Sequence, residues 1–310
     1  MVSAPLLLGI GGAHVDRRGQ VAGAYVPAAS NPGTMREEAG GGTLNALRNA
    51  VQRGVAARLV SVRGGDQAGE LVARTLAEWE IDDLSATFLD RVTPSYTAFL
   101  DAEGELIAGL ADMTLYEQAF PRIVGRRHVR AAIGEADAVL VDANVPAAAL
   151  EAVAGMASGP VYAIAISPAK AGRLAGILDR LACLFLNRRE IERLADGSDP
   201  ADALRFLRDG GCGSAIVSRG SEPLIGFDAD GLFSLSPPPV AAVADVTGAG
   251  DALAGATIAA LMRGLSLRAA AREGVAAAGL TIAAPTTVAR LGAAPFAAAL
   301  ALVPEAAPVA

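Results

Sequence analysis

The sequence predicts an α/β fold in which a doubly wound, mostly parallel sheet is flanked by helices. Short, continuous apolar runs such as Leu6–Ile10 and Ala138–Val141 fit strands that are buried on both faces. Segments with helical spacing, such as Pro146–Ala157, alternate with these runs, and this alternation is typical of parallel sheets. A chain of 310 residues is long for one domain and short for two. An α/β domain with a small inserted lid fits this length.

The first 80 residues begin the alternation. Leu6–Ile10 is expected to be a central strand that ends in a glycine-rich turn. The apolar positions of Leu44–Val51 lie on one helical stripe, and Gly54 ends that helix. A strand at Arg58–Val62 and an amphipathic helix at Ala68–Trp79, with its tryptophan in the core, are expected next.

From residue 137 the alternation becomes regular. The expected strands are Ala138–Val141, Val161–Ile166, Cys183–Leu186 and Ser214–Val217, and the expected helices are Pro146–Ala157, Lys170–Arg180 and Pro200–Arg208. Asp199 starts the last of these helices as its cap, since proline suits the first helical position. A hairpin of Leu224–Phe227 with Gly231–Ser234, a small-residue helix at Gly274–Thr281 and a packing helix in the tail Ala293–Ala310 follow.

Two segments interrupt this order and predict the lid. Arg17–Ala39 lacks helical period and is rich in glycine, proline, alanine and serine. Tyr96–Leu100 and Glu105–Gly109 are strand-like pieces around a turn. We therefore assign residues 17–39 and 89–110 to a small β lid. Residues 1–16, 40–88 and 111–310 are expected to form the large domain.

Composition excludes several classes of protein. The net charge of −7 gives no basic field for a nucleic-acid backbone. The two cysteines lack CxxC spacing, which favours a reduced, cytoplasmic protein without disulfides. Met1–Ile10 has no basic start and is expected to be a strand rather than a signal peptide. Prolines interrupt the apolar tail, so no membrane span is expected there.

The stretch Asp245–Gly255 carries the strongest chemical signal. Thr247-Gly248-Ala249-Gly250 is a tight turn that leads into an alanine-rich helix. The first amides of a helix have no internal partner, and the helix dipole adds positive charge there, so this turn predicts an anion site. Asp251 stands beside it and can take the proton of a hydroxyl that attacks a phosphate. The alternative is that Asp251 only complements the helix amino end.

A second group of candidates lies near the first strand. Asp16 follows that strand, and open α/β sheets bind ligands at the carboxyl ends of their strands. Gly40-Gly41-Gly42 precedes a helix whose first turn holds Asn45. These glycines can also be read as a flexible loop with Asn45 as a local cap. We favour contact with a ligand in view of Asp16 and of the family motif that the next paragraph describes.

The order of these motifs resembles the ribokinase-like, or PfkB-type, family of carbohydrate and nucleoside kinases. The early Gly-Gly-x-x-x-Asn, a middle Asn-x-x-Glu and the late Gly-Ala-Gly-Asp cover nearly the whole chain. The resemblance implies phosphate transfer from ATP with Mg²⁺ and a homodimer joined through the lid. It implies Asp251 as the base and an anion hole of Gly248, Ala249 and Gly250. The substrate would contact Asp16, Asn31, Gly41, Gly42 and Asn45.

The same resemblance assigns the nucleotide side. Asn187, Ser218, Gly220 and Thr247 would contact the nucleotide, and Glu190 would hold Mg²⁺ through water. The alternatives are a helix cap made by Asn187 and Glu190 and a plain turn after Ser218. The family often uses a monovalent cation such as K⁺ near a loop like Asp245–Thr247. The arginines between Asn187 and Glu190 depart from the family pattern, as does Thr43 after Gly42.

Within the family, several stretches most resemble pseudouridine kinases. They are Ile10–Asp16, Ser30–Gly33, Ala111–Glu117 and Ala277–Val288. They imply that pseudouridine is converted to its 5′-phosphate. Ribose, adenosine, cytidine or uridine are alternative acceptors, and a non-catalytic sugar-binding protein is another alternative. A Rossmann-type oxidoreductase is disfavoured, because His14 stands where the third glycine of its motif is required.

Overall fold

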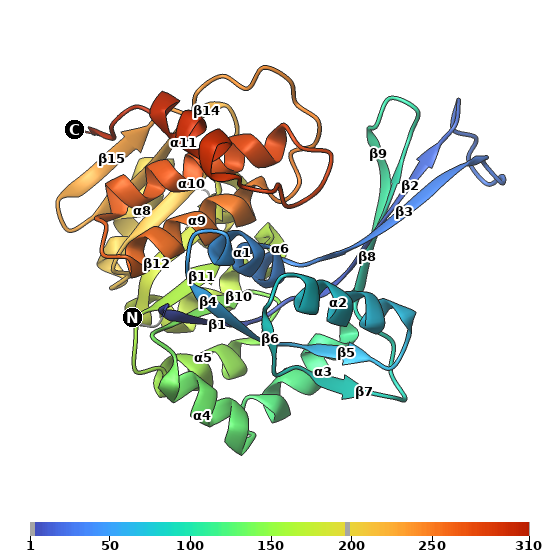
Figure 1. Ribbon diagram of the computed structural model, residues 1–310, viewed down its shortest axis with the longest axis horizontal. Coiled ribbons are helices and arrows are strands. Elements are labelled where there is room, and N and C mark those ends of the chain that lie inside the picture. Colours follow the sequence, from blue (N-terminus) through green and yellow to red (C-terminus); the bar gives the residue numbers. More distant parts are fainter. Residues whose placement is uncertain (1–3, 196–198, 310) are drawn as a thin grey trace.

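A ten-stranded sheet forms the centre of the computed structural model (Figure 1). The structure describes residues 4–195 and 199–309. The strands, in their order across the sheet, are β16 (Ala307–Pro308), β15 (Gly231–Leu235), β14 (Glu222–Asp228), β13 (Ala215–Arg219), β12 (Leu181–Asn187), β11 (Val161–Ile164), β10 (Ala138–Asp142), β1 (Leu6–Ile10), β4 (Ala56–Val60) and β6 (Asp82–Asp83). From β6 to β13 every neighbouring pair is parallel, whereas β13 to β16 are antiparallel. The predicted fold class is confirmed.

Helices cover both faces of this sheet, because the strand side chains alternate between two hydrophobic clusters. Leu7 and Leu140 belong to the first cluster, and Leu8 and Val141 to the second. The first cluster packs against α1 (Gly42–Val51), α2 (Gln67–Glu78), α9 (Ala249–Met262), α10 (Leu267–Ile282) and α11 (Ala293–Leu302). The second packs against α3 (Thr114–Ile123), α4 (Arg127–Glu135), α5 (Ala147–Met156), α6 (Pro168–Ala171), η1 (Gly172–Arg180), α7 (Arg188–Leu194) and α8 (Pro200–Asp209).

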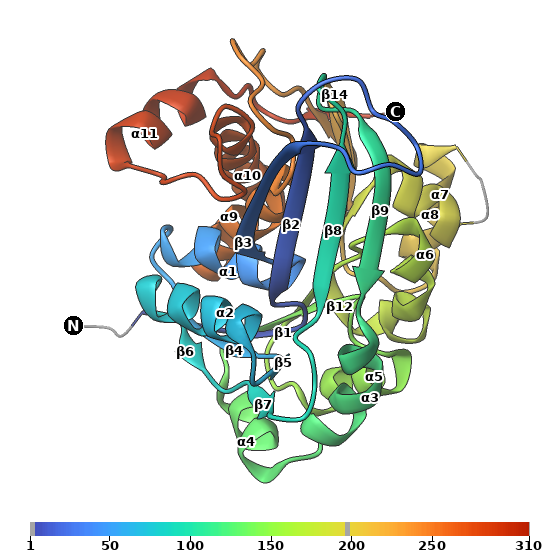
Figure 2. The same cartoon turned by 90° about the vertical axis from the view of Figure 1, so that its right-hand side faces the viewer.

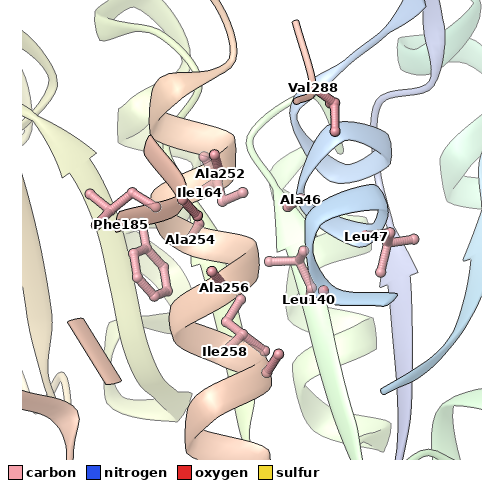
Figure 3. Close-up of a cluster of buried hydrophobic side chains, with 14 of the residues drawn as sticks. Ala46, Leu47, Leu140, Ile164, Phe185, Ala252, Ala254, Ala256, Ile258 and Val288 are labelled. Atoms are coloured by element: carbon pink, nitrogen blue, oxygen red, sulfur yellow. The ribbon is translucent and has the colours of Figure 1, made fainter. Parts of the chain in front are cut away.

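Helix α9 is apolar around its circumference and packs on the sheet between α1 and α10. Figure 3 shows Ala252, Ala254 and Ala256 of α9 in the cluster that Ala46 of α1 also enters. A Cβ added to Gly255 would lie 2.2 Å from the carbonyl oxygen of Ala46, so the two helix backbones are in close contact. Small residues thus fix the separation of α1 and α9.

A second sheet has four strands in the order β3 (Gly33–Gly40), β2 (His14–Val21), β8 (Ser95–Leu100) and β9 (Leu106–Asp112). It projects from the α/β body in Figure 1 and is seen broadside in Figure 2. Strands β2 and β8 pair in parallel, and the outer strands pair antiparallel to them. A short two-stranded sheet of β5 (Val62–Gly64) and β7 (Ala86–Phe88) lies beside the body.

Three elements differ from the sequence prediction. Lys170–Arg180 is not one α-helix: α6 ends at Ala171, and a 3₁₀ helix follows that contains Gly172 and Gly176, which disfavour an α-helix. The expected strand at Arg58–Val62 divides into β4 and β5. The tail is not only a helix, because α11 ends before Pro304 and β16 then pairs with β15.

One other expectation about the core, the buried tryptophan, is confirmed. Trp79 is 6% exposed and belongs to the first cluster. Cys183 and Cys212 are buried, free thiols. Within the two described ranges, no helix has the length and apolar character that crossing a membrane requires.

Candidate active site

The amino end of α9 presents backbone amides to open space. Gly248 caps the helix with a left-handed φ of +81°, and an added Cβ would lie 2.0 Å from the carbonyl oxygen of Thr287. Only glycine fits there without strain. At Gly250, an added Cβ would meet no atom of the described residues within 4 Å. The Ala249 amide donates to the Val246 carbonyl at 3.3 Å, whereas the helix dipole and the open space at Gly250 leave room for an anion at this end of the helix.

Asp251 lies in the first turn of α9 and is paired with Asn45. The Asn45 amide Nδ2 donates a hydrogen bond of 3.0 Å to the Asp251 Oδ2 atom. Asn45 lies in the first turn of α1 and is 3% exposed. The packing of α1 against α9 thus brings together two predicted site residues that are 206 positions apart in the chain.

The surroundings of Asp251 raise the pKa of its carboxyl group to about 7 from an ordinary value of 3.8. Burial is the main cause, since it disfavours the charged form. The negative charges of Asp142, Asp16 and Glu190 raise the pKa further, and the hydrogen bond from Asn45 opposes them. A carboxyl group with a pKa near neutrality is suited to general-base catalysis.

Asp142, at the end of β10, is a site residue that the sequence analysis missed. Its Oδ2 atom accepts hydrogen bonds from the Gly12 amide at 2.8 Å, the Thr43 amide at 3.2 Å and the Thr43 hydroxyl at 2.8 Å. Its Oδ1 atom accepts the Asn144 amide at 2.8 Å. One buried carboxylate thus ties the turn after β1 to the start of α1. An acidic residue that ends an apolar strand was the available signal.

The predicted substrate residues Gly41 and Gly42 lie between this carboxylate and Asp251. Gly41 has a φ of +108°, and an added Cβ would lie 2.4 Å from the Gly12 carbonyl oxygen. A Cβ at Gly42 would lie 2.2 Å from Ile166 and 3.4 Å from the Asp251 Oδ1 atom. Gly41 therefore requires glycine, whereas a side chain at Gly42 would displace the end of Ile166. The backbone of Gly42 borders the Asp251 carboxylate.

Asp16 also belongs to this region. It lies in β2, and its Oδ1 atom is 3.3 Å from the His14 Nε2 atom. Its charge contributes to the raised pKa of Asp251, as noted above. The structure therefore brings Asp16, Gly41, Gly42 and Asn45 into one neighbourhood around Asp251.

Asn31 lies apart from these residues. It belongs to the connection between β2 and β3, at the far end of the second sheet (Figure 1). Its Oδ1 atom accepts the Val26 amide at 2.8 Å, and its Nδ2 atom donates to the carbonyl groups of Val26 at 2.9 Å and Ala29 at 3.0 Å. In this structure its amide group holds its own loop together.

Two cavities lie away from Asp251. One of about 450 Å³ is lined by residues of the second sheet, among them Asn31 and Phe99. The other, of about 500 Å³, is lined by Phe88, Leu115 and Arg122, among others.

Three of the predicted nucleotide residues, and Glu190, lie at or just after the carboxyl ends of β12 and β13. Asn187 and Glu190 form a capping box at α7: the Asn187 side chain accepts the Glu190 amide at 3.0 Å, and Glu190 accepts the Asn187 amide at 2.8 Å. The helix cap that the sequence analysis gave as the alternative reading is therefore formed in the structure. Ser218 donates to the Leu186 carbonyl at 3.4 Å, and Gly220 has a left-handed φ of +66°.

Thr247 lies in the loop before α9. Its amide donates to the Asp245 Oδ1 atom at 2.8 Å. Asp245 in turn forms an ion pair with Arg18 of β2. The loop that carries Thr247 is thus connected to the second sheet.

Comparison with known proteins decides the family. The model of the pfkB family carbohydrate kinases matches residues 6–291. The chain belongs to this family. The predicted family is therefore confirmed, and the chain is a kinase of the sugar and nucleoside class rather than a Rossmann-type oxidoreductase.

The relatives of this PfkB-family kinase agree with the assignment. A carbohydrate kinase from Agrobacterium tumefaciens has a solved structure with a TM-score of 0.87 and 41% sequence identity, covering 97% of this chain and 99% of the other. The uncharacterized sugar kinase YeiI of Escherichia coli (strain K12) is 28% identical over 280 residues, which are 88% of this chain and 76% of that protein. The pseudouridine kinase of the same organism is 27% identical over 251 residues, 79% of this chain and 80% of that protein.

Proposed function

We propose that this PfkB-family kinase transfers a phosphoryl group from ATP to the 5′-hydroxyl of a nucleoside, and that its acceptor is pseudouridine. The observation that carries the reaction type is the position of Asp251, beside the open backbone of Gly250 at the amino end of α9. A base and an anion site side by side are what phosphoryl transfer to a hydroxyl needs.

Each residue of the site has a role in this proposal. Asp251 takes the proton of the acceptor hydroxyl as its oxygen attacks the phosphorus. The amides of Gly248, Ala249 and Gly250 stabilise the negative charge on the transferred group. Asn45 holds the Asp251 carboxylate through its hydrogen bond of 3.0 Å. Gly41 and Gly42 let the sugar approach the backbone, and Asp16 accepts hydrogen bonds from its hydroxyls.

We propose ATP with Mg²⁺ as the phosphoryl donor. Solved structures of similar fold include an Arabidopsis thaliana ribokinase complexed with ribose and ATP (21% identity, TM-score 0.83) and an Escherichia coli ribokinase II in complex with ATP and Mg²⁺ (18% identity, TM-score 0.79). Across the described residues, no group of three or more His, Cys, Asp or Glu side chains is arranged to hold a metal ion. We propose that Mg²⁺ keeps its waters and binds mainly to the phosphates, with Glu190 acting through water.

The nucleotide itself would contact Asn187, Ser218, Gly220 and Thr247. All four lie at the carboxyl ends of β12 and β13 or precede α9, where open α/β sheets bind ligands. Replacing K⁺ by Na⁺ in the assay tests whether a monovalent cation acts near Asp245 and Thr247.

Pseudouridine as the acceptor is supported by the similarity to the Escherichia coli pseudouridine kinase. Its base carries a free N1–H group that uridine lacks. A pocket with an acceptor for this group would leave that acceptor unpaired with uridine, at a cost of about 1–3 kcal/mol. We assign this contact to Asn31, whose amide can donate and accept. Because the β2–β3 loop is distant in this structure, it must move to the site or come from a second copy.

We propose that residues 17–39 and 89–110 act as a lid over residues 1–16, 40–88 and 111–310, and that two copies of the chain join through it. The second sheet leaves several large apolar side chains exposed: Tyr25, Val26, Met35, Phe99, Leu106 and Leu110. Such a patch marks an interface. Light scattering should give a dimer, and Met35→Glu with Leu110→Glu should give a monomer. The buried thiols fit a reducing compartment, and we place the protein in the cytoplasm, without a nucleic-acid or membrane partner.

The test is to measure kcat/KM with ATP and Mg²⁺ for pseudouridine, uridine, cytidine, adenosine, ribose and fructose. The Asp251→Asn variant is the negative control. Pseudouridine should exceed uridine by roughly 5- to 150-fold, which corresponds to the cost of one unpaired acceptor. If ribose or adenosine is used faster, the acceptor assignment is wrong and the reaction type stands. If no acceptor consumes ATP, the reaction type is wrong.

A further inference from the structure

A chain of polar contacts leads from α3 to Asp16. Tyr116 of α3 is fully buried and packs against Phe120, with 5.4 Å between the ring centroids. Its hydroxyl oxygen lies 2.9 Å from the Ala13 amide nitrogen and 3.2 Å from the His14 Nδ1 atom. The other ring nitrogen of His14, Nε2, lies 3.3 Å from the Asp16 Oδ1 atom. A tyrosine, a histidine and an aspartate are thus connected in series.

The direction of these polar contacts follows from the groups involved. The Asp16 Oδ1 atom lies at an ion-pair distance of 3.3 Å from His14 Nε2, and a carboxylate oxygen only accepts, so a proton on Nε2 faces Asp16. In the neutral ring, Nδ1 is then the acceptor, and the Tyr116 hydroxyl donates to it. The Ala13 amide only donates, so the Tyr116 oxygen accepts there. Burial holds the pKa of Tyr116 well above its ordinary value, which keeps the donated proton on the hydroxyl.

The positions of these three residues in the fold indicate what their contacts do. His14 and Asp16 are two residues apart in β2 and therefore point to the same face of the strand. Tyr116 comes from the α/β body, 102 residues further along the chain. A long-range contact thus fixes the first residues of β2, where the second sheet leaves the body. His14 is 6% exposed, so it lies behind Asp16 rather than at the surface.

We propose that Tyr116 and His14 are positioning residues, which orient the Asp16 carboxylate toward the sugar hydroxyls of the acceptor. This inference rests on the proposed function, in which Asp16 binds those hydroxyls. Neither side chain is needed to touch the acceptor. Tyr116 sets the tautomer of His14, and His14 sets the rotamer of Asp16.

The first test is independent of turnover. The chain has two histidines, His14 and His128, so the ¹⁵N imidazole spectrum contains two ring systems. His14 should give the pattern of a proton on Nε2, and Tyr116→Phe should change its signals and leave those of His128 unchanged. The Tyr162→Phe variant is the matched control, since Tyr162 is buried in β11 outside the site. A proton on Nδ1 alone, or His14 signals that ignore Tyr116→Phe, would overturn the proposal.

The second test reads the sugar contact itself. Tyr116→Phe should raise the acceptor KM by roughly 3- to 10-fold, the effect of one neutral hydrogen bond, with kcat and the KM for ATP within about twofold of wild type. Removal of a sugar hydroxyl from the acceptor should lower kcat/KM less in Tyr116→Phe than in wild type. Tyr162→Phe should retain the full wild-type penalty for that removal. Equal penalties in Tyr116→Phe and wild type would show a structural role only.

A double-mutant cycle completes the test. His14→Ala and the double variant Tyr116→Phe/His14→Ala should have the same acceptor KM, because both interrupt the same series. His14→Gln, which keeps an N–H donor, should recover part of the loss. Additive effects of the two single changes would overturn the series. A wild-type protein that uses no acceptor would instead refute the proposed function, and the imidazole spectrum would still decide the tautomer and its dependence on Tyr116.

Discussion

Replacing Asp251 by Asn should abolish turnover and at the same time stabilise the fold. The folded protein raises the pKa of this carboxyl group from an ordinary value of 3.8 to about 7, chiefly through burial. Between these two values the folded state holds a proton that the unfolded chain has lost, so the stability of the wild type falls as pH rises. At roughly 1.4 kcal/mol per pH unit, the fall is on the order of 4 kcal/mol between about pH 4 and pH 7, and it is complete above that window.

The asparagine variant lacks this fall because its side chain is neutral at every pH. Its Oδ1 atom can still accept the hydrogen bond that Asn45 donates. Urea unfolding at pH 4.5, 6 and 8.5 should therefore show a gap between the two proteins that opens with pH and then levels. Asp209→Asn, at an exposed position at the end of α8, is the control and should differ from wild type by about 0.5 kcal/mol or less.

Two results would refute this reasoning. A gap that does not change with pH would mean that the Asp251 carboxyl group is not held protonated by the fold. Turnover near the wild-type level in Asp251→Asn would mean that another group accepts the proton, since a general base contributes roughly 10²–10⁴-fold. The combination of lost activity and gained stability is the signature of a carboxylate kept for catalysis.

Four further predictions concern the same site. Gly248→Ala should lower the free energy of unfolding by about 1–3 kcal/mol in urea titrations, because the left-handed backbone and a carbonyl oxygen 2.0 Å from the new Cβ oppose the substitution. Gly250→Val should keep the wild-type Tm but lose roughly 10²–10³-fold in kcat. Unchanged turnover in Gly250→Val would place the anion hole elsewhere. Asp16→Ala should raise the acceptor KM more than Asn45→Ala, since charged hydrogen bonds are worth about 1.5–3 kcal/mol; a change in the KM for ATP alone would contradict this placement. The kcat/KM of the wild type should fall on the acid side of about pH 7 as Asp251 becomes protonated, and a flat profile down to pH 5 would argue against it.

Local signals in the sequence were sufficient for much of the fold. Apolar runs and helical stripes predicted the strands and helices of the α/β body, and glycines next to an acidic residue pointed to the start of α9. The structure places Asp251 and Asn45 within hydrogen-bond distance, although their roles stay predictions. The boundary at Gly172 was missed, because a 3₁₀ helix and an α-helix share the same apolar spacing over a short segment.

Residues whose importance depends on distant partners were not predictable. Nothing near Tyr116 in the sequence shows that its hydroxyl meets Ala13 and His14. Asp142 was passed over because its four donors come from Gly12, Thr43 and Asn144, which only the folded sheet brings together. Asn31 was predicted to contact the substrate from a resemblance. Its loop lies away from the site, and a short motif could not show this because it does not encode the position of the second sheet.

The contact between Gly255 and the Ala46 carbonyl has a consequence for how this kinase can diversify. Two backbones in contact have no rotamers to exchange, so the spacing of α1 and α9 cannot be adjusted by small side-chain changes. Asn45 belongs to α1 and Asp251 to α9, so this pair is expected to keep its geometry in any variant that folds. New acceptor substrates must then be accommodated by the strands and loops of the second sheet. These can vary in length and sequence while the reacting groups keep their positions.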